Sequence, residues 1–340
     1  MSTELNVVEC RGTPREMGRQ YGEQAKEGIR KNLEKRARRD SPKTRETAAA
    51  MRRVVSRFVP DVLEEIDGIA EGANLNADLL FVDNHVPLLE DDHPSRCTVI
   101  AMNGSEDQTL VAKNNDAPVD EDFDFVIRRC TPDHGIPSIQ VTYAGWLSGL
   151  DAMNAEGLAN THGSVGSRFD TSGERIDIRL LAYHLLRRCR RTDEFLDGLR
   201  QAPLTGKGFS IGVGDAQGCT AMVDAAVPFV AVRDRNAPFA YSTNLYMAKG
   251  MENADARPPQ KRPVCVYRYG YLRWRELTRP PRGLADLKGL LACHDPWAPC
   301  RHGGPHGSRT VWSMIARPEQ GTVLIANSNP CENDYVEFSL

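Results

Sequence analysis

Two short stretches near residue 100 decide the fold: residues 95–103 read SRCTVIAMN and residues 109–116 read TLVAKNND. Before Cys97 the sequence is typical of helices and charged loops, whereas β-branched residues follow Cys97 directly. Residues 104–107 read GSED and supply turn chemistry before the second apolar run begins. The pattern therefore predicts a β-hairpin that Cys97 opens, with the carboxyl group of Asp116 at the end of its second strand.

A cysteine at the start of a strand, directly after a polar loop, suggests an N-terminal nucleophile. The loop at residues 90–94 reads EDDHP, and an exposed segment of this kind can be cut without unravelling a core. Cleavage before Cys97 would free an α-amino group, which titrates at about 7.7–8.0 and can act as a general base on the thiol. Taken alone, Cys97 is more often a small buried apolar side chain than a nucleophile.

Composition excludes several classes of protein. The 340 residues are 40% hydrophobic and 26% charged, and the net charge of −3 argues against a dedicated nucleic-acid binder. No apolar run reaches the roughly 18 residues that a membrane span needs, and the first residues lack a secretory signal pattern. Nine cysteines without a short repeating spacing fit reduced thiols better than a disulfide framework. We therefore expect a cytoplasmic protein with neither nucleic acid nor membrane as partner.

The segment before Cys97 reads as helices. Residues 13–16 (TPRE) combine a capping threonine, proline at the first helical position and glutamate three residues after the cap. The helix that they open carries an apolar stripe as far as Ile29. Another helix reaches about Val59, and Pro60 opens the next one.

The segment after Cys97 is rich in strands, which come in hairpin-sized groups, while its helices come in blocks. The predicted strands are residues 97–103, 109–114, 124–130, 138–144, 157–162, 209–213, 219–223, 229–232, 239–243, 310–316, 322–326 and 335–338. The predicted helices are residues 176–190, one from residue 192, 264–277 and 284–293. This order favours an α+β fold in which two stacked antiparallel sheets lie between helical layers, a four-layer αββα sandwich. We expect one integrated domain, with a helical segment 1–96 and a catalytic segment 97–340.

Three further features could carry chemistry. Asn244 follows a predicted strand; such an asparagine is usually a turn residue, but its amide could donate to an oxyanion. His294, Cys300, His302 and His306 form a cluster of metal-ligand types whose spacing matches no standard zinc pattern. Residues 327–333 read NSNPCEN, which is most simply a turn between two strands.

Together these features resemble the acyl-coenzyme A:6-aminopenicillanic acid acyltransferase (isopenicillin N acyltransferase-like) family of autoproteolytic N-terminal nucleophile hydrolases. The resemblance runs nearly end to end. It rests on residues 12–22 (GTPREMGRQYG), 96–98 (RCT), 114–116 (NND), 243–244 (TN), His294 with 300–303 (CRHG), and 329–335 (NPCENDY). Two positions depart from it: Arg96 stands where glycine is frequent, and Asn115 stands where an aromatic residue is usual.

The resemblance implies a self-processing enzyme that is cleaved between Arg96 and Cys97 into two chains that stay associated. The Cys97 sulfur would then attack an amide or acyl thioester of a small molecule, and the acyl-enzyme would pass to water or to an acceptor amine. The resemblance assigns the oxyanion donor to Asn244, and positioning of the Cys97 amine to Asp116. It implies no cofactor and no metal, and an oligomer is compatible with it.

Two alternatives stay open. Arg96 before the nucleophile keeps open an unprocessed, catalytically silent binding protein of the same fold. His294, Cys300, His302 and His306 keep open a metal-dependent hydrolase. The acyl group, the acceptor, and the choice between hydrolysis and acyl transfer do not follow from the sequence.

Overall fold

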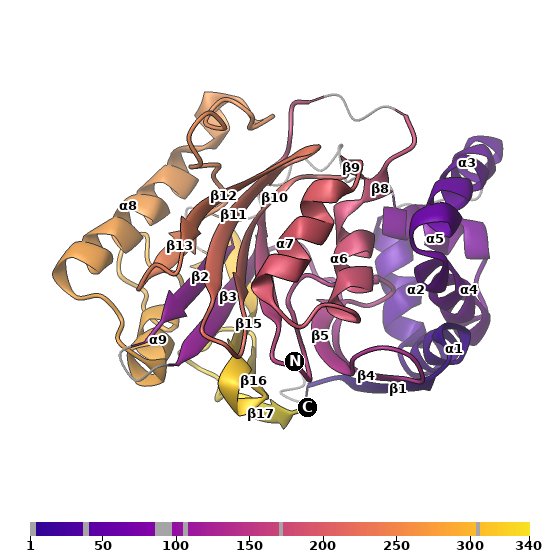
Figure 1. Cartoon of the computed structure of the whole chain (residues 1–340), viewed down its shortest axis with the longest axis horizontal. Helices are drawn as coiled ribbons and strands as arrows, with labels where there is room; N and C mark the ends of the chain where they lie inside the picture. Colours follow the sequence, from indigo (N-terminus) through magenta and orange to yellow (C-terminus); the bar gives the residue numbers. More distant parts are fainter. Residues whose placement is uncertain (1–4, 37–40, 86–96, 105–107, 170–172, 304–306) are drawn as a thin grey trace.

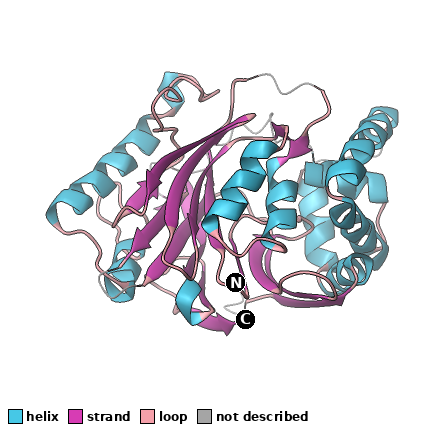
Figure 2. Ribbon diagram, viewed as in Figure 1, coloured by secondary structure: helices cyan, strands magenta, loops and turns pink. Residues whose placement is uncertain are grey.

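The computed structural model describes residues 5–36, 41–85, 97–104, 108–169, 173–303 and 307–340. In this part of the chain, two β-sheets stack face to face and helices cover both outer faces (Figures 1 and 2). The predicted four-layer αββα sandwich is therefore confirmed.

One sheet has the strand order β1-β4-β5-β6-β7-β10-β11-β12. Its strand β1 pairs with β4 in parallel, and the other neighbours are antiparallel. The strands are β1 (Val7–Gly12), β4 (Phe125–Pro132), β5 (Ser138–Tyr143), β6 (Ala152–Asn154), β7 (Ala159–Ser164), β10 (Phe209–Gly214), β11 (Thr220–Ala226) and β12 (Phe229–Arg235).

The other sheet has the order β13-β2-β3-β15-β16-β17, with β14 beside β15. Its strands are β2 (Thr98–Asn103), β3 (Thr109–Pro118), β13 (Ala240–Ser242), β14 (His302–Gly303), β15 (Ser308–Arg317), β16 (Thr322–Asn327) and β17 (Val336–Ser339). The predicted hairpin is β2–β3, in which Thr98 lies opposite Asn114. Strand β2 lies between β13 and β3, so Cys97 stands at the end of an interior strand.

The helices on the two outer faces pack against the sheets and form separate hydrophobic cores with them. One face carries α1 (Pro14–Gln24), α2 (Lys26–Lys35), α3 (Pro42–Phe58), α4 (Pro60–Ala73), α5 (Ala77–His85), α6 (Ile178–Leu186) and α7 (Thr192–Gln201). The other face carries α8 (Pro263–Thr278) and α9 (Leu284–Leu291), whose Leu272 and Leu290 pack with Ile100 of β2. A third core, which includes Val111, Met153 and Trp312, fills the space between the sheets.

The N-terminal helices differ in detail from the prediction. The capping box is present, because Thr13 accepts from the amide of Glu16 while the Glu16 carboxylate accepts from the amide of Thr13. The expected continuous helix to Ile29 is wrong, since the backbone leaves helical geometry at Ala25 (φ −107°, ψ 14°) and α2 begins at the next residue. Gly18 allows α1 to lie close to α4: a Cβ there would lie 2.1 Å from the carbonyl oxygen of Glu65.

Several short strands do not follow from the sequence pattern. Strand β1 belongs to the segment before Cys97, which is therefore not purely helical. The predicted helix at 176–190 begins only at Ile178, because Ile176 and Asp177 pair with β9 (Leu204–Thr205) as β8 (Ile176–Asp177). Among the described residues, no helix combines the length and the apolar character that a membrane crossing requires.

Candidate functional site

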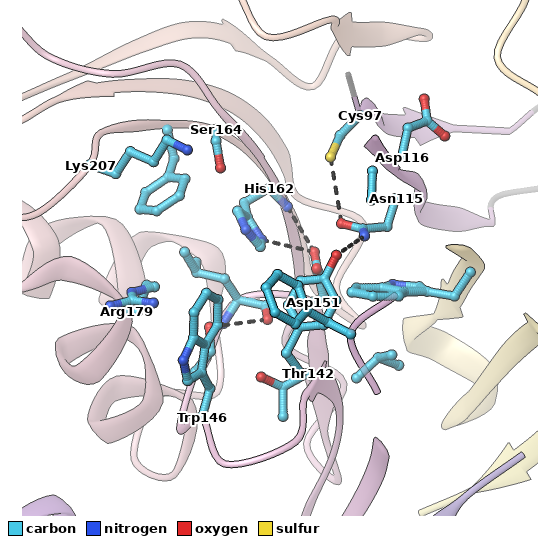
Figure 3. A pocket seen from close by; sticks show the side chains of 18 of the residues that line it. Cys97, Asn115, Asp116, Thr142, Trp146, Asp151, His162, Ser164, Arg179 and Lys207 are labelled. Carbon is cyan, nitrogen blue, oxygen red and sulfur yellow. Dashed lines mark hydrogen bonds and ion pairs between the residues drawn. The ribbon is translucent and has the colours of Figure 1, made fainter. Parts of the chain in front are cut away.

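Cys97 lies at a pocket whose lining comes from both sheets (Figure 3). Its side chain is buried, with 4% of its surface exposed. Asp116 lines the same pocket, so the structure brings together the two ends of the predicted hairpin. The apolar part of the lining is mainly aromatic and includes Phe123, Tyr143, Trp146, Phe209 and Trp312.

The Cys97 sulfur makes a hydrogen bond with the side chain of Asn115. The thiol donates to Asn115 Oδ1 at 3.5 Å, and Asn115 Nδ2 donates to the hydroxyl of Tyr143 at 3.2 Å (Figure 3). Burial raises the pKa of the Cys97 thiol, while the nearby Lys113 ammonium and the backbone amide of Asp116 act in the opposite direction. The thiol is therefore mostly protonated at neutral pH, and its activation requires a base.

Asp116 faces the opposite side of β3 from Asn115, as strand alternation requires. Its Oδ1 atom accepts from the hydroxyl of Thr310 at 2.8 Å. Burial raises the pKa of the Asp116 carboxyl to about 7, although Arg268 and the Thr310 hydrogen bond oppose the rise. Its Oδ2 atom has no hydrogen-bond partner among the residues that the structure describes. One carboxyl oxygen can therefore still accept a hydrogen bond.

Asn244 is near the same site but does not line the pocket. It follows β13 in the left-handed conformation (φ 64°), which asparagine tolerates better than most residues. One of its two amide N–H bonds donates to the carbonyl of Ser164, a pocket residue, at 2.8 Å. A side chain at position 163 would crowd this amide, because a Cβ on Gly163 would lie 3.2 Å from Asn244 Nδ2.

Arg268 of α8 links the predicted site residues. Its guanidinium donates to the backbone carbonyl of Cys97, and also to Asn244 Oδ1 at 3.4 Å. The same guanidinium acts on the carboxyl of Asp116, whose pKa it lowers. Sequence reasoning missed this residue. The available signal was its position: Arg268 lies on the same helical stripe as the buried Cys265 and Leu272.

A second unpredicted group is a buried ionic cluster beside the pocket. His162 Nδ1 lies 3.0 Å from Asp151 Oδ1 (Figure 3). Lys113 Nζ lies 2.6 Å from Asp151 Oδ2. Burial alone would raise the pKa of Asp151, but His162 and Lys113 together lower it to about 2. Burial lowers the pKa of His162, against the attraction of Asp151. The local sequence gives no signal for this cluster, because each member comes from a different strand or loop.

The candidate metal ligands are only partly those expected. The structure groups His294, Cys300 and His302 with Cys331, for which the sequence predicts only a turn. His306 lies outside the described residues, as does Arg96 of the predicted cleavage site. The fourth member of the described group is therefore a cysteine 29 residues beyond His302 in the sequence.

No protein-family model matches the chain, and no curated protein does. Among solved structures, the chain is similar to a mutant of conjugated bile acid hydrolase from Clostridium perfringens. The identity is 12%, the match covers 72% of this chain and 97% of that chain, and the TM-score is 0.44. It is also similar to penicillin V acylase from Agrobacterium tumefaciens, with 14% identity, 68% and 83% coverage and a TM-score of 0.41.

A third similar structure is the Caenorhabditis elegans ortholog of N-acylethanolamine-hydrolyzing acid amidase. Its identity is 15%, the match covers 66% of this chain and 93% of that chain, and the TM-score is 0.44. Identities and TM-scores this low do not assign an activity to this chain. The resemblance to the isopenicillin N acyltransferase-like family stays a prediction.

Proposed function

We propose that this chain is a self-processing cysteine hydrolase or acyltransferase of the N-terminal nucleophile type, acting on an amide or acyl thioester of a small molecule. The observation that carries the proposal is the pairing of Cys97 and Asp116 at one pocket. Cys97 is buried next to the start of an interior strand. The Asp116 carboxyl, which points to the other side of β3 from Asn115, has one oxygen without a hydrogen-bond partner among the described residues.

Maturation would begin with attack of the Cys97 sulfur on the carbonyl carbon of Arg96. The acyl group moves from the Cys97 nitrogen to its sulfur, and water then hydrolyses the thioester. The products are a carboxylate on Arg96 and a free amine on Cys97. Asp116 suits a role in this step because a carboxyl with a pKa of about 7 can give or take a proton at neutral pH.

In the mature enzyme, the free amine of Cys97 would take the thiol proton and later give it to the leaving amine. This base is needed because burial keeps the thiol protonated. The thiolate attacks the substrate carbonyl, and negative charge develops on its oxygen. Asn244 can stabilise that charge. Its side-chain amide has two N–H bonds: one donates to the carbonyl of Ser164, and the second can donate to the oxyanion. Arg268 acts by positioning, since it holds both the Cys97 carbonyl and the Asn244 amide oxygen.

The pocket wall indicates the kind of acyl group. Five aromatic side chains line it, and their apolar surface suits an apolar acyl portion. Arg36 also lines the pocket, but its guanidinium is 2.6 Å from the buried carboxylate of Asp83 and stacks on Trp146. Further charged residues, Glu121, Arg179 and Lys207, line other parts of the pocket. We therefore infer that the aromatic part of the wall holds an apolar portion of the acyl group.

One denaturing mass spectrum of the purified protein tests the proposal. We expect two chains, with residues 1–96 and 97–340, that elute together under native conditions. Cys97→Ala should remain a single chain, whereas Cys219→Ser, a matched change outside the pocket, should mature normally. A single full-length mass in protein that hydrolyses N-acyl amides would reject self-processing. A full-length protein that binds such amides without turnover would support the silent binding protein instead.

A further inference from the structure

The four-residue cluster of His294, Cys300, His302 and Cys331 has no part in the mechanism above. One potential ligand atom from each residue lies within 4.8 Å of the corresponding atoms of the other three. His294 follows α9, Cys300 lies two residues before β14, His302 is the first residue of β14, and Cys331 lies in the turn after β16. Segments that are distant in sequence therefore meet at one point.

Of the three distances known between His302, Cys300 and Cys331, two match those around a tetrahedral zinc ion and the third is slightly shorter. Zinc binds sulfur at about 2.3 Å and nitrogen at about 2.0–2.1 Å, so neighbouring ligand atoms lie roughly 3.3–3.8 Å apart. The two sulfurs of Cys300 and Cys331 are 3.5 Å apart. His302 Nε2 is 3.6 Å from the Cys300 sulfur and 3.1 Å from the Cys331 sulfur. The two sulfurs are too far apart for a disulfide, which needs about 2.0 Å.

The surroundings of the cluster also suit a metal. Asn329 Nδ2 donates to the Cys300 sulfur at 3.4 Å, as expected next to a thiolate ligand. The other ring nitrogen of His302, Nδ1, faces the Glu332 carboxylate at 3.6 Å. Carboxylates commonly orient zinc-binding histidines from this side.

We propose that this four-residue cluster binds one Zn²⁺ ion in a closed, structural site. Two thiolates and two neutral imidazoles would neutralise the ion and complete its tetrahedron. Four protein ligands leave no position for a reactive water. The cluster is therefore a poor candidate for the metal-dependent hydrolase considered from the sequence.

The zinc site would also hold in place the residues that contact Asp116. Arg301, between two of the ligands, exchanges two hydrogen bonds with Thr310: its amide donates to Thr310 Oγ1 at 3.0 Å, and its carbonyl accepts from the Thr310 amide at 2.8 Å. The hydroxyl of Thr310 then donates to Asp116 at 2.8 Å. Zinc would thus act on Asp116 through a positioning residue, Thr310. This consequence rests on the proposed function, whereas zinc binding does not.

Elemental analysis of the full chain, purified without chelator, tests the proposal. We expect about one zinc ion per chain. Cys331→Ser should lose it. Cys293→Ser should keep it, because Cys293 is adjacent to His294 in the sequence but its sulfur contacts the Tyr271 hydroxyl at 3.2 Å and is not part of the cluster.

A second measurement covers the case in which Cys331→Ser does not fold. Wild-type protein stripped with a chelator and titrated with Co²⁺ should show the visible bands of a tetrahedral ion with sulfur ligands, and the metal should raise the melting temperature. Wild-type protein with no stoichiometric metal and no such Co²⁺ spectrum would overturn the proposal, as would stoichiometric iron or copper in place of zinc. Zinc-loaded wild type that never cleaves at Cys97 would instead reject the proposed function and leave the zinc site standing.

Discussion

The thiol of Cys97 donates a hydrogen bond to the side-chain oxygen of Asn115 at 3.5 Å. Asn115 is one of the two positions at which the sequence departs from the family that it resembles. The departure places an amide, instead of an aromatic ring, next to the proposed nucleophile. Because the amide oxygen accepts from the thiol, it favours the protonated form and fixes the direction of the sulfur.

Asn115→Asp should make the Cys97 thiolate harder to form. The new carboxylate would lie about as far from the sulfur as the present amide oxygen, and repulsion between like charges should raise the thiol pKa further. The pH dependence of alkylation by iodoacetamide measures this shift. Asn103→Asp, at the far end of β2, is the control. An unchanged alkylation profile in Asn115→Asp would show that the contact does not govern the thiol.

Asn244→Ala should lower turnover far more than it weakens substrate binding. Loss of one oxyanion donor typically costs about 10²–10³ in kcat. Alanine is also strained at this positive φ, so Asn244→Gly, which removes the side chain without that strain, should show the same loss. Asn236→Ala, at another left-handed asparagine (φ 52°), is the control for the strain; it also loses the hydrogen bond that Asn236 Oδ1 accepts from the Thr220 amide. Near-normal kcat in folded, processed Asn244→Gly would remove Asn244 from the site.

Asp116→Asn should accumulate uncleaved precursor. Its folded pKa of about 7 lies far above the usual value, so the carboxyl becomes ionised only as the pH rises through about 7. If the carboxylate form assists cleavage, wild-type maturation should speed up across that range, and the asparagine variant should lose this dependence. A denaturing gel follows the precursor over time. Asp120→Asn, at an exposed position just after β3, is the control, and equal maturation of both variants would contradict the assignment.

Much of the fold could be predicted because its signals are local. The switch from helical pattern to β-branched residues at Cys97 depends on neighbouring residues, and so does the capping box at Thr13. Strand β1 was missed because it is only six residues long and its partner β4 is more than 100 residues away. The break at Ala25 was missed because it has no turn residue and follows a helix held against α4 by tertiary packing.

The candidate site likewise combines contacts that local sequence indicates with contacts that it does not. Cys97 and Asp116 lie in one hairpin, so their proximity follows from strand pairing alone. Arg268 reaches the Cys97 carbonyl across 171 residues, and no local pattern encodes that contact. Cys331 meets His302 only after β15 and β16 have paired, which explains why the sequence indicated an incomplete ligand set at that cluster.

The buried pair of Lys113 and Asp151 should stabilise the fold and give it a distinct acid sensitivity. Both side chains are essentially inaccessible, with 0% and 1% exposed. Removing one partner of such a pair leaves an uncompensated buried charge, at a cost of about 3–5 kcal/mol. Asp151→Asn should therefore lower the free energy of unfolding at pH 7 by roughly that amount.

The pH dependence of this effect has a definite sign. The pKa of Asp151 is about 2 in the folded chain and about 3.9 in an unfolded one, so the unfolded state binds more protons between these values. The stabilisation is present above pH about 4 and is lost as the pH falls from about 4 to about 2. His162, whose pKa is lowered by burial, adds a further loss that begins as the pH falls below about 6.5, where the unfolded histidine takes up a proton.

Urea unfolding of wild type and Asp151→Asn between pH 7 and pH 3 measures both effects. The difference in the free energy of unfolding should be largest at neutral pH and should narrow as the pH falls below about 4, because wild type then loses the charge that the variant lacks. Asp197→Asn, at an exposed carboxyl on α7, should follow wild type closely. Parallel stability curves for wild type and Asp151→Asn over the whole range would show that the Asp151 carboxylate does not hold Lys113 as an ion pair.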